Sequence, residues 1–189
     1  MITKFKIFES YQEIKSICDK YNIQNWEVNP ETGLVDVRGD VNLSGKNLKE
    51  LPLKFGRVSG DFNCSYNQLT SLEGGPSSVG RDFNCSDNQL TSLEGGPNSV
   101  GGGFYCSNNQ IRDFKVPEYS LNEDRKFECI GNPIFEIYKL FNTPKCIDLI
   151  NECEVIGDEV ISRIRLEEVF LELGMEFPKN LRFENWKLV

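Results

Sequence analysis

The sequence predicts an α/β repeat solenoid, in which short parallel strands stack into a ladder and helices close both ends. Residues 58–78 (VSGDFNCSYNQLTSLEGGPSS) are followed directly by residues 79–99 (VGRDFNCSDNQLTSLEGGPNS), and the two copies differ at only four positions. Apolar residues recur in five columns at this period of 21 residues. Because a unit this short buries no apolar face of its own, the copies must stack on one another to form a core.

The apolar columns extend the repeat beyond these two copies. They are Val37/Val58/Val79/Val100, Val41/Phe62/Phe83/Phe104, Leu43/Cys64/Cys85/Cys106, Leu48/Leu69/Leu90/Ile111 and Leu51/Leu72/Leu93/Phe114. A fifth copy fits only with two inserted residues, which place Phe127, Cys129, Asn132 and Ile134 in register. We therefore expect a repeat region at 37–137, with coils at 37–57, 58–78, 79–99 and 100–122 and a partial coil at 123–137.

Each copy predicts a short strand, an asparagine and a turn. Phe83 and Cys85 alternate with a polar residue, as in a strand that sends every second side chain inward. The side chain of Asn88 is placed to hydrogen-bond backbone groups of neighbouring coils where the chain turns inward. Gly95, Gly96 and Pro97 then supply the turn back.

The pattern Phe-x-Cys-x-x-Asn-x-Leu-x-x-Leu at 83–93 resembles the leucine-rich repeat, with cysteine where leucine is common. This resemblance covers residues 37–137 and implies a leucine-rich-repeat-like parallel strand ladder. The elements VxGDF and CSxNQLTSLEGGP also resemble uncharacterised repeat proteins of tailed bacteriophages, which implies a binder and inhibitor of a host or defence protein. Lys46 departs from the asparagine column of Asn67, Asn88, Asn109 and Asn132, which puts the first rung of the hydrogen-bond ladder in doubt.

Residues 1–36 predict an N-terminal cap made of a helix and a hairpin. Ser10 and Glu13 form a capping box, and apolar residues from Tyr11 to Tyr21 follow at helical spacing, so we expect a helix at about 10–21. Strand, turn and strand follow from Trp26 to Val37. Such a unit would cover the open end of the first coil.

Residues 138–189 predict a C-terminal helical segment. A short helix is expected at 135–141, and a second is expected to have Thr143 as its cap and Pro144 in its first turn. A third is capped by Asp158 and ends at Gly174, and its apolar side is formed by Val160, Ile161, Ile164, Val169, Phe170 and Leu173. The apolar tail from Phe177 to Val189 either packs back on these helices, which we expect, or meets a partner.

Composition restricts the class of partner. The formal charge of −8 argues against a general nucleic-acid binder, which needs a clustered basic face. No apolar run approaches the ~18 to 20 residues that span a bilayer, and the N-terminus lacks the apolar stretch of a signal peptide. We therefore expect a cytoplasmic protein with a protein partner and no membrane contact.

The cysteines predict neither a metal site nor disulfides. The chain has seven cysteines and no histidine. Cys64, Cys85, Cys106 and Cys129 fall in one inward column, and a straight ladder cannot place four sulfurs around one zinc ion. We expect small buried hydrophobic side chains and free thiols, as in a reducing cytoplasm.

No pattern predicts catalysis or a cofactor. The sequence lacks a Gly-x-Ser-x-Gly motif, a phosphate loop and any histidine for a nucleophile–base pair. Gly101, Gly102 and Gly103 resemble a phosphate cradle only superficially, since they precede a strand rather than a helix. A small catalytic domain in the C-terminal segment is a further hypothesis, but residues 138–189 are short for one.

Binding therefore remains, on the outward face of the strand ladder. The candidate partner-binding residues are Asp61, Asn63, Tyr66, Asp82, Asn84, Tyr105, Lys126, Glu128 and Ile130. The outward-facing residues of the first coils are nearly identical from one coil to the next. Tyr105, Lys126, Glu128 and Ile130 instead introduce residue types that anchor interfaces, so we expect the partner to contact the C-terminal half of the ladder. The alternative for this face is a solvated surface whose near-identical rows reflect recent duplication.

Two functions remain open. The first is a non-enzymatic protein–protein interaction module, expected as a monomer. The alternative is a self-associating structural or virion-associated protein, because an imperfectly capped solenoid end pairs with another copy.

Overall fold

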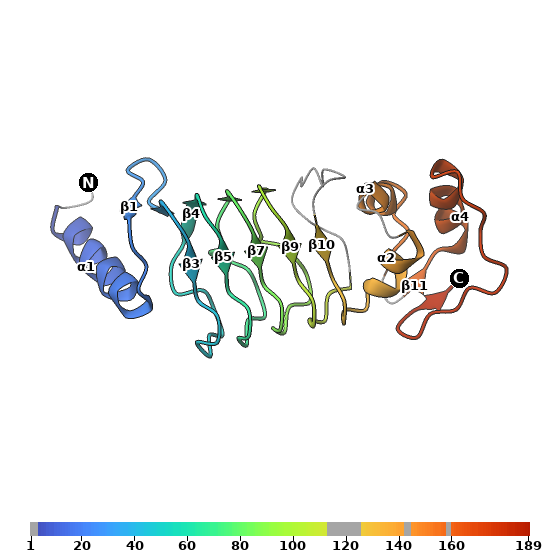
Figure 1. Ribbon diagram of the computed structural model, residues 1–189, viewed down its shortest axis with the longest axis horizontal. Coiled ribbons are helices and arrows are strands. Elements are labelled where there is room, and N and C mark those ends of the chain that lie inside the picture. Colours follow the sequence, from blue (N-terminus) through green and yellow to red (C-terminus); the bar gives the residue numbers. More distant parts are fainter. Residues whose placement is uncertain (1–3, 113–125, 142–144, 158–159) are drawn as a thin grey trace.

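The computed structural model describes residues 4–112, 126–141, 145–157 and 160–189. These residues form an elongated solenoid with helices at both ends (Figure 1). Helix α1 (Lys4–Tyr21) lies at the N-terminal end, and α2 (Phe135–Phe141), α3 (Lys145–Glu152) and α4 (Arg163–Glu172) lie at the C-terminal end. The strands of the coils are parallel and stack along the long axis. The predicted repeat solenoid with helices at both ends is therefore confirmed.

The predicted strand ladder runs through β3 (Val41–Asn42), β5 (Phe62–Asn63), β7 (Phe83–Asn84), β9 (Phe104–Tyr105) and β10 (Phe127–Glu128). All neighbours are parallel, and Val41, Phe62, Phe83, Phe104 and Phe127 occupy one register position. The register confirms the repeat of 21 residues, with the two inserted residues before the last strand. We call this sheet the phenylalanine ladder.

A second ladder runs along the other side of the coils. It contains β1 (Trp26–Val28), β2 (Val35–Val37), β4 (Phe55–Val58), β6 (Ser78–Val79) and β8 (Ser99–Val100). The pair β1–β2 is antiparallel, which confirms the N-terminal hairpin, and the remaining pairs are parallel. The valine column of the sequence thus belongs to a strand of its own, which the repeat pattern did not reveal.

The core is a stack of equivalent side chains between the two ladders. The ring centroids of Phe62 and Phe83 lie 5.8 Å apart, and those of Phe83 and Phe104 lie 5.0 Å apart. The side chains that are fully buried beside them from the leucine columns are Leu69, Leu72, Leu90, Leu93 and Ile111, whereas Phe114 lies outside the described residues. Aromatic contacts at these distances add to the stabilisation from apolar burial.

The cysteine column is part of this core, as expected. Cys64, Cys85, Cys106 and Cys129 are buried and form no disulfide. Burial raises the pKa of the Cys64 and Cys129 thiols to about 12. These thiols therefore stay protonated and act as small hydrophobic side chains.

The asparagine column joins successive coils, which confirms its predicted role. Asn88 Nδ2 donates to the carbonyl oxygens of Cys64, at 3.0 Å, and Cys85, at 3.1 Å. Its Oδ1 accepts from Leu69 N at 2.9 Å, in the preceding coil. Equivalent bonds are made by Asn67, Asn109 and Asn132.

Lys46 does not interrupt this ladder. Each asparagine reaches back into the preceding coil, so Asn67 serves the first coil. Its Oδ1 accepts from Lys46 N at 2.9 Å and from Leu48 N at 3.0 Å. The doubt raised by the missing asparagine at position 46 is therefore removed.

At the N-terminus, α1 covers Lys4–Tyr21 and begins six residues earlier than expected. Ser10 lies inside the helix, so the predicted capping box is wrong. The preceding residues contain neither glycine nor proline, and nothing in them stops the helix. Cys18 is fully buried, and the Tyr11 ring packs on Trp26 at 5.3 Å.

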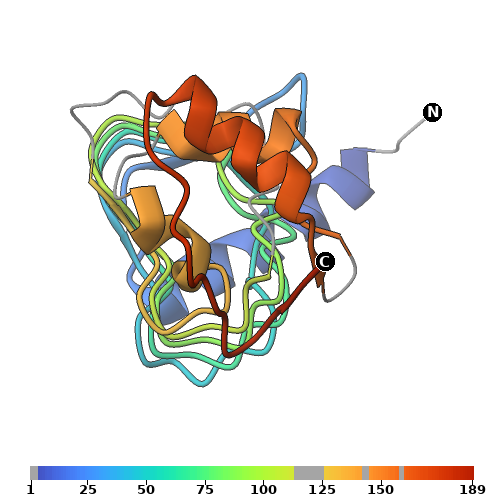
Figure 2. The ribbon, with the colours of Figure 1, turned by 90° about the vertical axis from the view of Figure 1, so that its right-hand side faces the viewer.

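At the C-terminus, α2 spans Phe135–Phe141, as expected, and α3 spans Lys145–Glu152. The proposed cap at Thr143 and Pro144 lies outside the described residues. Seen along the solenoid, these helices, α4 and the tail lie over the end of the coils (Figure 2). None of the described helices is long and apolar enough to cross a membrane.

Helix α4 is shorter than predicted and spans Arg163–Glu172, with Ser162 as its N-cap residue. Val160 and Ile161 form strand β11, which pairs with β12 (Lys187–Leu188), so their assignment to the helix is wrong. Both are β-branched, and the tail offers them a parallel partner strand. Asp158, the expected cap, lies outside the described residues.

The end of α4 and most of its buried side agree with expectation. Gly174 has a φ of +66° and ends the helix, because glycine adopts this left-handed conformation readily. Val169 and Phe170 are buried. Ile164, however, points to solvent and is 72% exposed, which contradicts its place on the apolar side.

The apolar tail packs back onto the molecule, as expected. Trp186 is buried and its Nε1 donates to the Pro133 carbonyl at 3.1 Å. The buried Glu136 carboxylate accepts from the backbone amides of Glu184, at 2.7 Å, and Asn185, at 3.0 Å. The first turn of α2 thereby fixes the tail in place.

Candidate protein-binding surface

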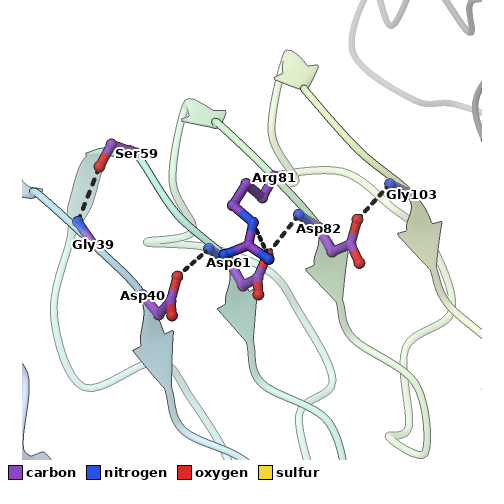
Figure 3. A network of polar contacts seen from close by, with 7 residues as sticks. All are labelled: Gly39, Asp40, Ser59, Asp61, Arg81, Asp82 and Gly103. Carbon is purple, nitrogen blue, oxygen red and sulfur yellow. Dashed lines mark hydrogen bonds and ion pairs between the residues drawn. The ribbon is translucent and has the colours of Figure 1, made fainter.

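The outward row of aspartates next to the phenylalanine ladder is bonded into the fold. Asp40, Asp61 and Asp82 each accept, through Oδ1, the backbone amide of the equivalent residue one coil later (Figure 3). The distances are 2.8 Å to Asp61 N, 3.0 Å to Asp82 N and 2.7 Å to Gly103 N. The predicted site residues Asp61 and Asp82 therefore satisfy amides that the ladders leave without a partner.

The outward-facing asparagines two positions after the aspartates also form hydrogen bonds within the fold. Asn63 Oδ1 accepts from Ser65 N at 3.0 Å and from Ser65 Oγ at 2.7 Å. Asn84 Oδ1 accepts from Ser86 N at 3.0 Å. These local turns are typical of asparagine at a strand end, and they occupy the side-chain oxygens that a partner would otherwise use.

At the C-terminal end of the phenylalanine ladder the pattern changes. Glu128 pairs in register with Tyr105 across β9 and β10. Lys126 Nζ lies 3.1 Å from Glu128 Oε2 and 5.2 Å from the centroid of the Tyr105 ring. The hydrogen bond to Glu128 raises the pKa of Lys126. The structure thus brings three predicted site residues together, and we call them the Tyr105 cluster.

The Tyr105 ring lies close to Gly103, where no side chain stands in its way. A Cβ atom at position 103 would lie 2.7 Å from atoms of that ring, so a larger residue there would displace the ring from its present position. In the two preceding coils this position holds Asp61 and Asp82. The aspartate row therefore ends at Gly103, and the Tyr105 ring lies beside this glycine and near the Lys126 ammonium.

Ile130 extends the surface beyond the Tyr105 cluster. It lies two residues after Glu128 and is 51% exposed. Its carbonyl accepts the Asn108 amide at 2.7 Å, which places it beside Ser107 and at the end of the column Ser44, Ser65, Ser86 and Ser107. An exposed isoleucine thus ends a column of serines.

Tyr66 lies apart from the cluster, two coils nearer the N-terminus. It is 67% exposed and has a φ of +54°. The equivalent left-handed positions hold Gly45, Asp87, Asn108 and Gly131, which tolerate this conformation better than tyrosine. Those residue types in one column were the sequence signal for strain at Tyr66, and sequence reasoning missed it.

The backbone amides of the three glycines before β9 all donate hydrogen bonds within the fold. Gly101 N donates to the Val79 carbonyl at 2.8 Å, Gly102 N to the Arg81 carbonyl at 2.8 Å, and Gly103 N to Asp82. Within the described ranges, no group of three or more His, Cys, Asp or Glu residues is placed to hold a metal ion.

Comparison of the chain with protein-family models, with curated proteins and with solved structures found no match.

Proposed function

We propose that this protein is a non-enzymatic protein-interaction module whose partner contacts the Tyr105 cluster and Ile130. The observation that carries the proposal is the position of the Tyr105 ring beside Gly103. Aromatic side chains held in one position anchor interfaces well, because little conformational entropy is lost when a partner covers them.

The charged members of the cluster suit a partner of mixed charge. Lys126 and Glu128 form an ion pair whose two side chains are 63% and 34% exposed. A surface pair of this kind contributes only about 0 to 1 kcal/mol to stability. Its two charges are therefore available to partner groups, while Ile130 supplies apolar area beside them.

The sequence resemblance suggests the biological setting. A leucine-rich-repeat-like protein of a tailed bacteriophage would act in the host cytoplasm, where it would bind and inhibit a host or defence protein. The acidic charge of −8 favours a partner with basic regions. The phage setting of the proposal rests on the sequence resemblance, and the preference for a basic partner rests on the charge.

The test is co-purification from lysate of the host cell, with mass spectrometry of what is recovered. The bait is the tagged full chain, and the test variant combines Tyr105→Ala with Glu128→Lys. A matched control combines Tyr11→Ala with Glu94→Lys, which makes the same replacements at exposed positions elsewhere.

We expect a partner that is recovered with the wild type and the control and is lost with the test variant. Retention of that partner by the folded test variant would refute the proposed surface. Recovery of the bait alone, together with a dimer mass in solution, would instead favour the self-associating structural protein.

A further inference from the structure

Helix α4 carries apolar side chains on two opposite faces. Leu166, Val169 and Phe170 are buried against the C-terminal helices and the tail. Ile164 and Leu171 are 72% and 77% exposed, which are the highest values among large hydrophobic side chains of the described residues. At ~100° per residue these two side chains lie about 20° apart on the helix, roughly opposite the buried face.

This outer face differs from an ordinary solvated helix surface. A single exposed hydrophobic residue is common, but two at a spacing of seven form a stripe typical of a helix packed on both sides. Glu168 lies between Ile164 and Leu171 on the same face. We call Ile164, Glu168 and Leu171 the outer stripe of α4.

The charges around the stripe are unbalanced. Arg163 Nε bonds Glu167 at 2.8 Å, and Arg165 bonds Glu154 at 2.9 Å, so both arginines of α4 are already paired. Glu168 and Glu172 form no salt bridge with any residue in the described part of the chain. Two negative charges therefore remain for a partner to neutralise.

We propose that the outer stripe of α4 binds a basic amphipathic helix of another protein. Two apolar anchors one heptad apart match the ridges of a partner helix, and lysine or arginine at its flanks pairs with Glu168 and Glu172. This surface is separate from the Tyr105 cluster, and its occupant is identified by shape and charge.

A second copy of this chain fits the stripe poorly. Antiparallel two-fold pairing of Ile164 with Leu171 of the other copy puts the symmetry axis midway between them, next to Glu167 and Glu168. Each Glu168 would then lie opposite Glu167 of the other copy and close to its Glu168, and like charges in contact are unfavourable. Anionic membranes are disfavoured for the same electrostatic reason.

The probe is a synthetic amphipathic peptide of about 18 residues, long enough for five helical turns, with leucines along one face and lysines on both flanks. Its control has glutamate in place of every lysine. Binding to the full-length protein is measured by isothermal titration calorimetry, and the mass of the protein alone by analytical ultracentrifugation.

Three double variants locate the contact. Ile164→Ser with Leu171→Ser removes the anchors, and Glu168→Lys with Glu172→Lys reverses the free charges. Glu73→Lys with Glu94→Lys changes the net charge equally at exposed positions on the coils.

We expect the lysine peptide to bind, and each α4 variant to weaken it at least about tenfold, as for lost anchors and reversed contact charges. The coil variant should change the dissociation constant by less than about threefold, because its charges lie outside the contact. Failure of the lysine peptide to bind, equal binding of the glutamate peptide, or equal effects of the two charge reversals would overturn the proposal. A dimer abolished by Ile164→Ser with Leu171→Ser would assign the stripe to a second copy and would also overturn it.

Discussion

Replacing Asn88 with alanine tests how the coils are held together. The substitution removes the Oδ1 that accepts from Leu69 N, and this amide has no other hydrogen-bond partner among the described residues. The carbonyl oxygens that accept from Asn88 Nδ2 each keep another donor after the substitution. Cys64 O still accepts from Asn67, Cys85 O from Asn109, and Ser86 O from the Tyr66 amide.

One buried donor is therefore orphaned, and several donated bonds are lost. An unsatisfied buried group costs about 1–3 kcal/mol, and each lost hydrogen bond about 0.5–1.5 kcal/mol. We expect Asn88→Ala to lower the free energy of unfolding by about 2–4 kcal/mol, relative to a typical domain stability of about 5–15 kcal/mol.

Two further variants calibrate this value. Asn67→Ala removes similar bonds where the side chain is only partly buried, so water replaces them and the cost is about 1 kcal/mol. Gln89→Ala changes an exposed neighbour and should stay within about 0.5 kcal/mol.

The assay is equilibrium urea denaturation of all three variants, followed by circular dichroism. The denaturant dependence of the free energy should be unchanged, so that midpoint shifts report stability. A cost for Asn88→Ala no larger than that for Gln89→Ala would refute the reasoning, since the asparagine column would then not join the coils.

Three more predictions follow from buried or strained side chains. Glu136→Ala leaves two tail amides without their acceptor, so we expect the free energy of unfolding to fall by about 2–4 kcal/mol and the Trp186 fluorescence to shift to the red. Glu136→Gln should cost less because it keeps an acceptor oxygen. Unchanged emission from the alanine variant would argue against the role of Glu136 in fixing the tail. In the native protein at pH 8, the partly buried Cys153 should react with a thiol reagent well before Cys85. The reason is that only the thiolate reacts, and desolvation raises the pKa of Cys85 far more strongly. Rapid modification of Cys85 in the native state, mapped by mass spectrometry, would contradict this order. Tyr66→Asn should stabilise the fold by about 0.5–1 kcal/mol, because asparagine tolerates a positive φ, and a lower melting temperature would count against strain at this site.

The repeating part of the fold was predictable because equivalent residues meet equivalent surroundings. A period of 21 residues placed the phenylalanines and cysteines in one ladder, and the asparagine column followed from the need to satisfy turning backbone. Sequence reasoning missed the second ladder. Its strands β6 and β8 each contain one buried side chain, Val79 or Val100, and so show no alternation, whereas Phe83 of β7 is followed two residues later by the buried Cys85.

The C-terminal region was less predictable because it depends on contacts between distant residues. Val160 and Ile161 have helical spacing with the residues that follow, but the tail strand β12 recruits them into a sheet. No local pattern reveals a pairing partner 27 residues away, from Val160 to Lys187. Tertiary contact overrode local preference here.

The candidate site was predictable in its residue types but not in its geometry. Sequence reasoning selected Tyr105, Lys126 and Glu128 because they break a monotonous surface. It also selected Asp61 and Asp82, whose carboxylates instead bond backbone amides of the next coil. The distinction required knowing that the ladder leaves those amides without partners, which only the stacking of the coils determines.

The central claim is that a protein partner covers the Tyr105 cluster and Ile130. Hydroxyl-radical footprinting of the protein with and without the co-purified partner tests it most directly, because the method reports side-chain exposure residue by residue. Tyr105 and Ile130 should lose reactivity in the complex, while the exposed Tyr11 on α1, the helix at the N-terminal end (Figure 1), keeps its reactivity. Unchanged reactivity at Tyr105 and Ile130 in a saturated complex would contradict the claim, and protection confined to Ile164 and Leu171 would place the partner on α4 instead.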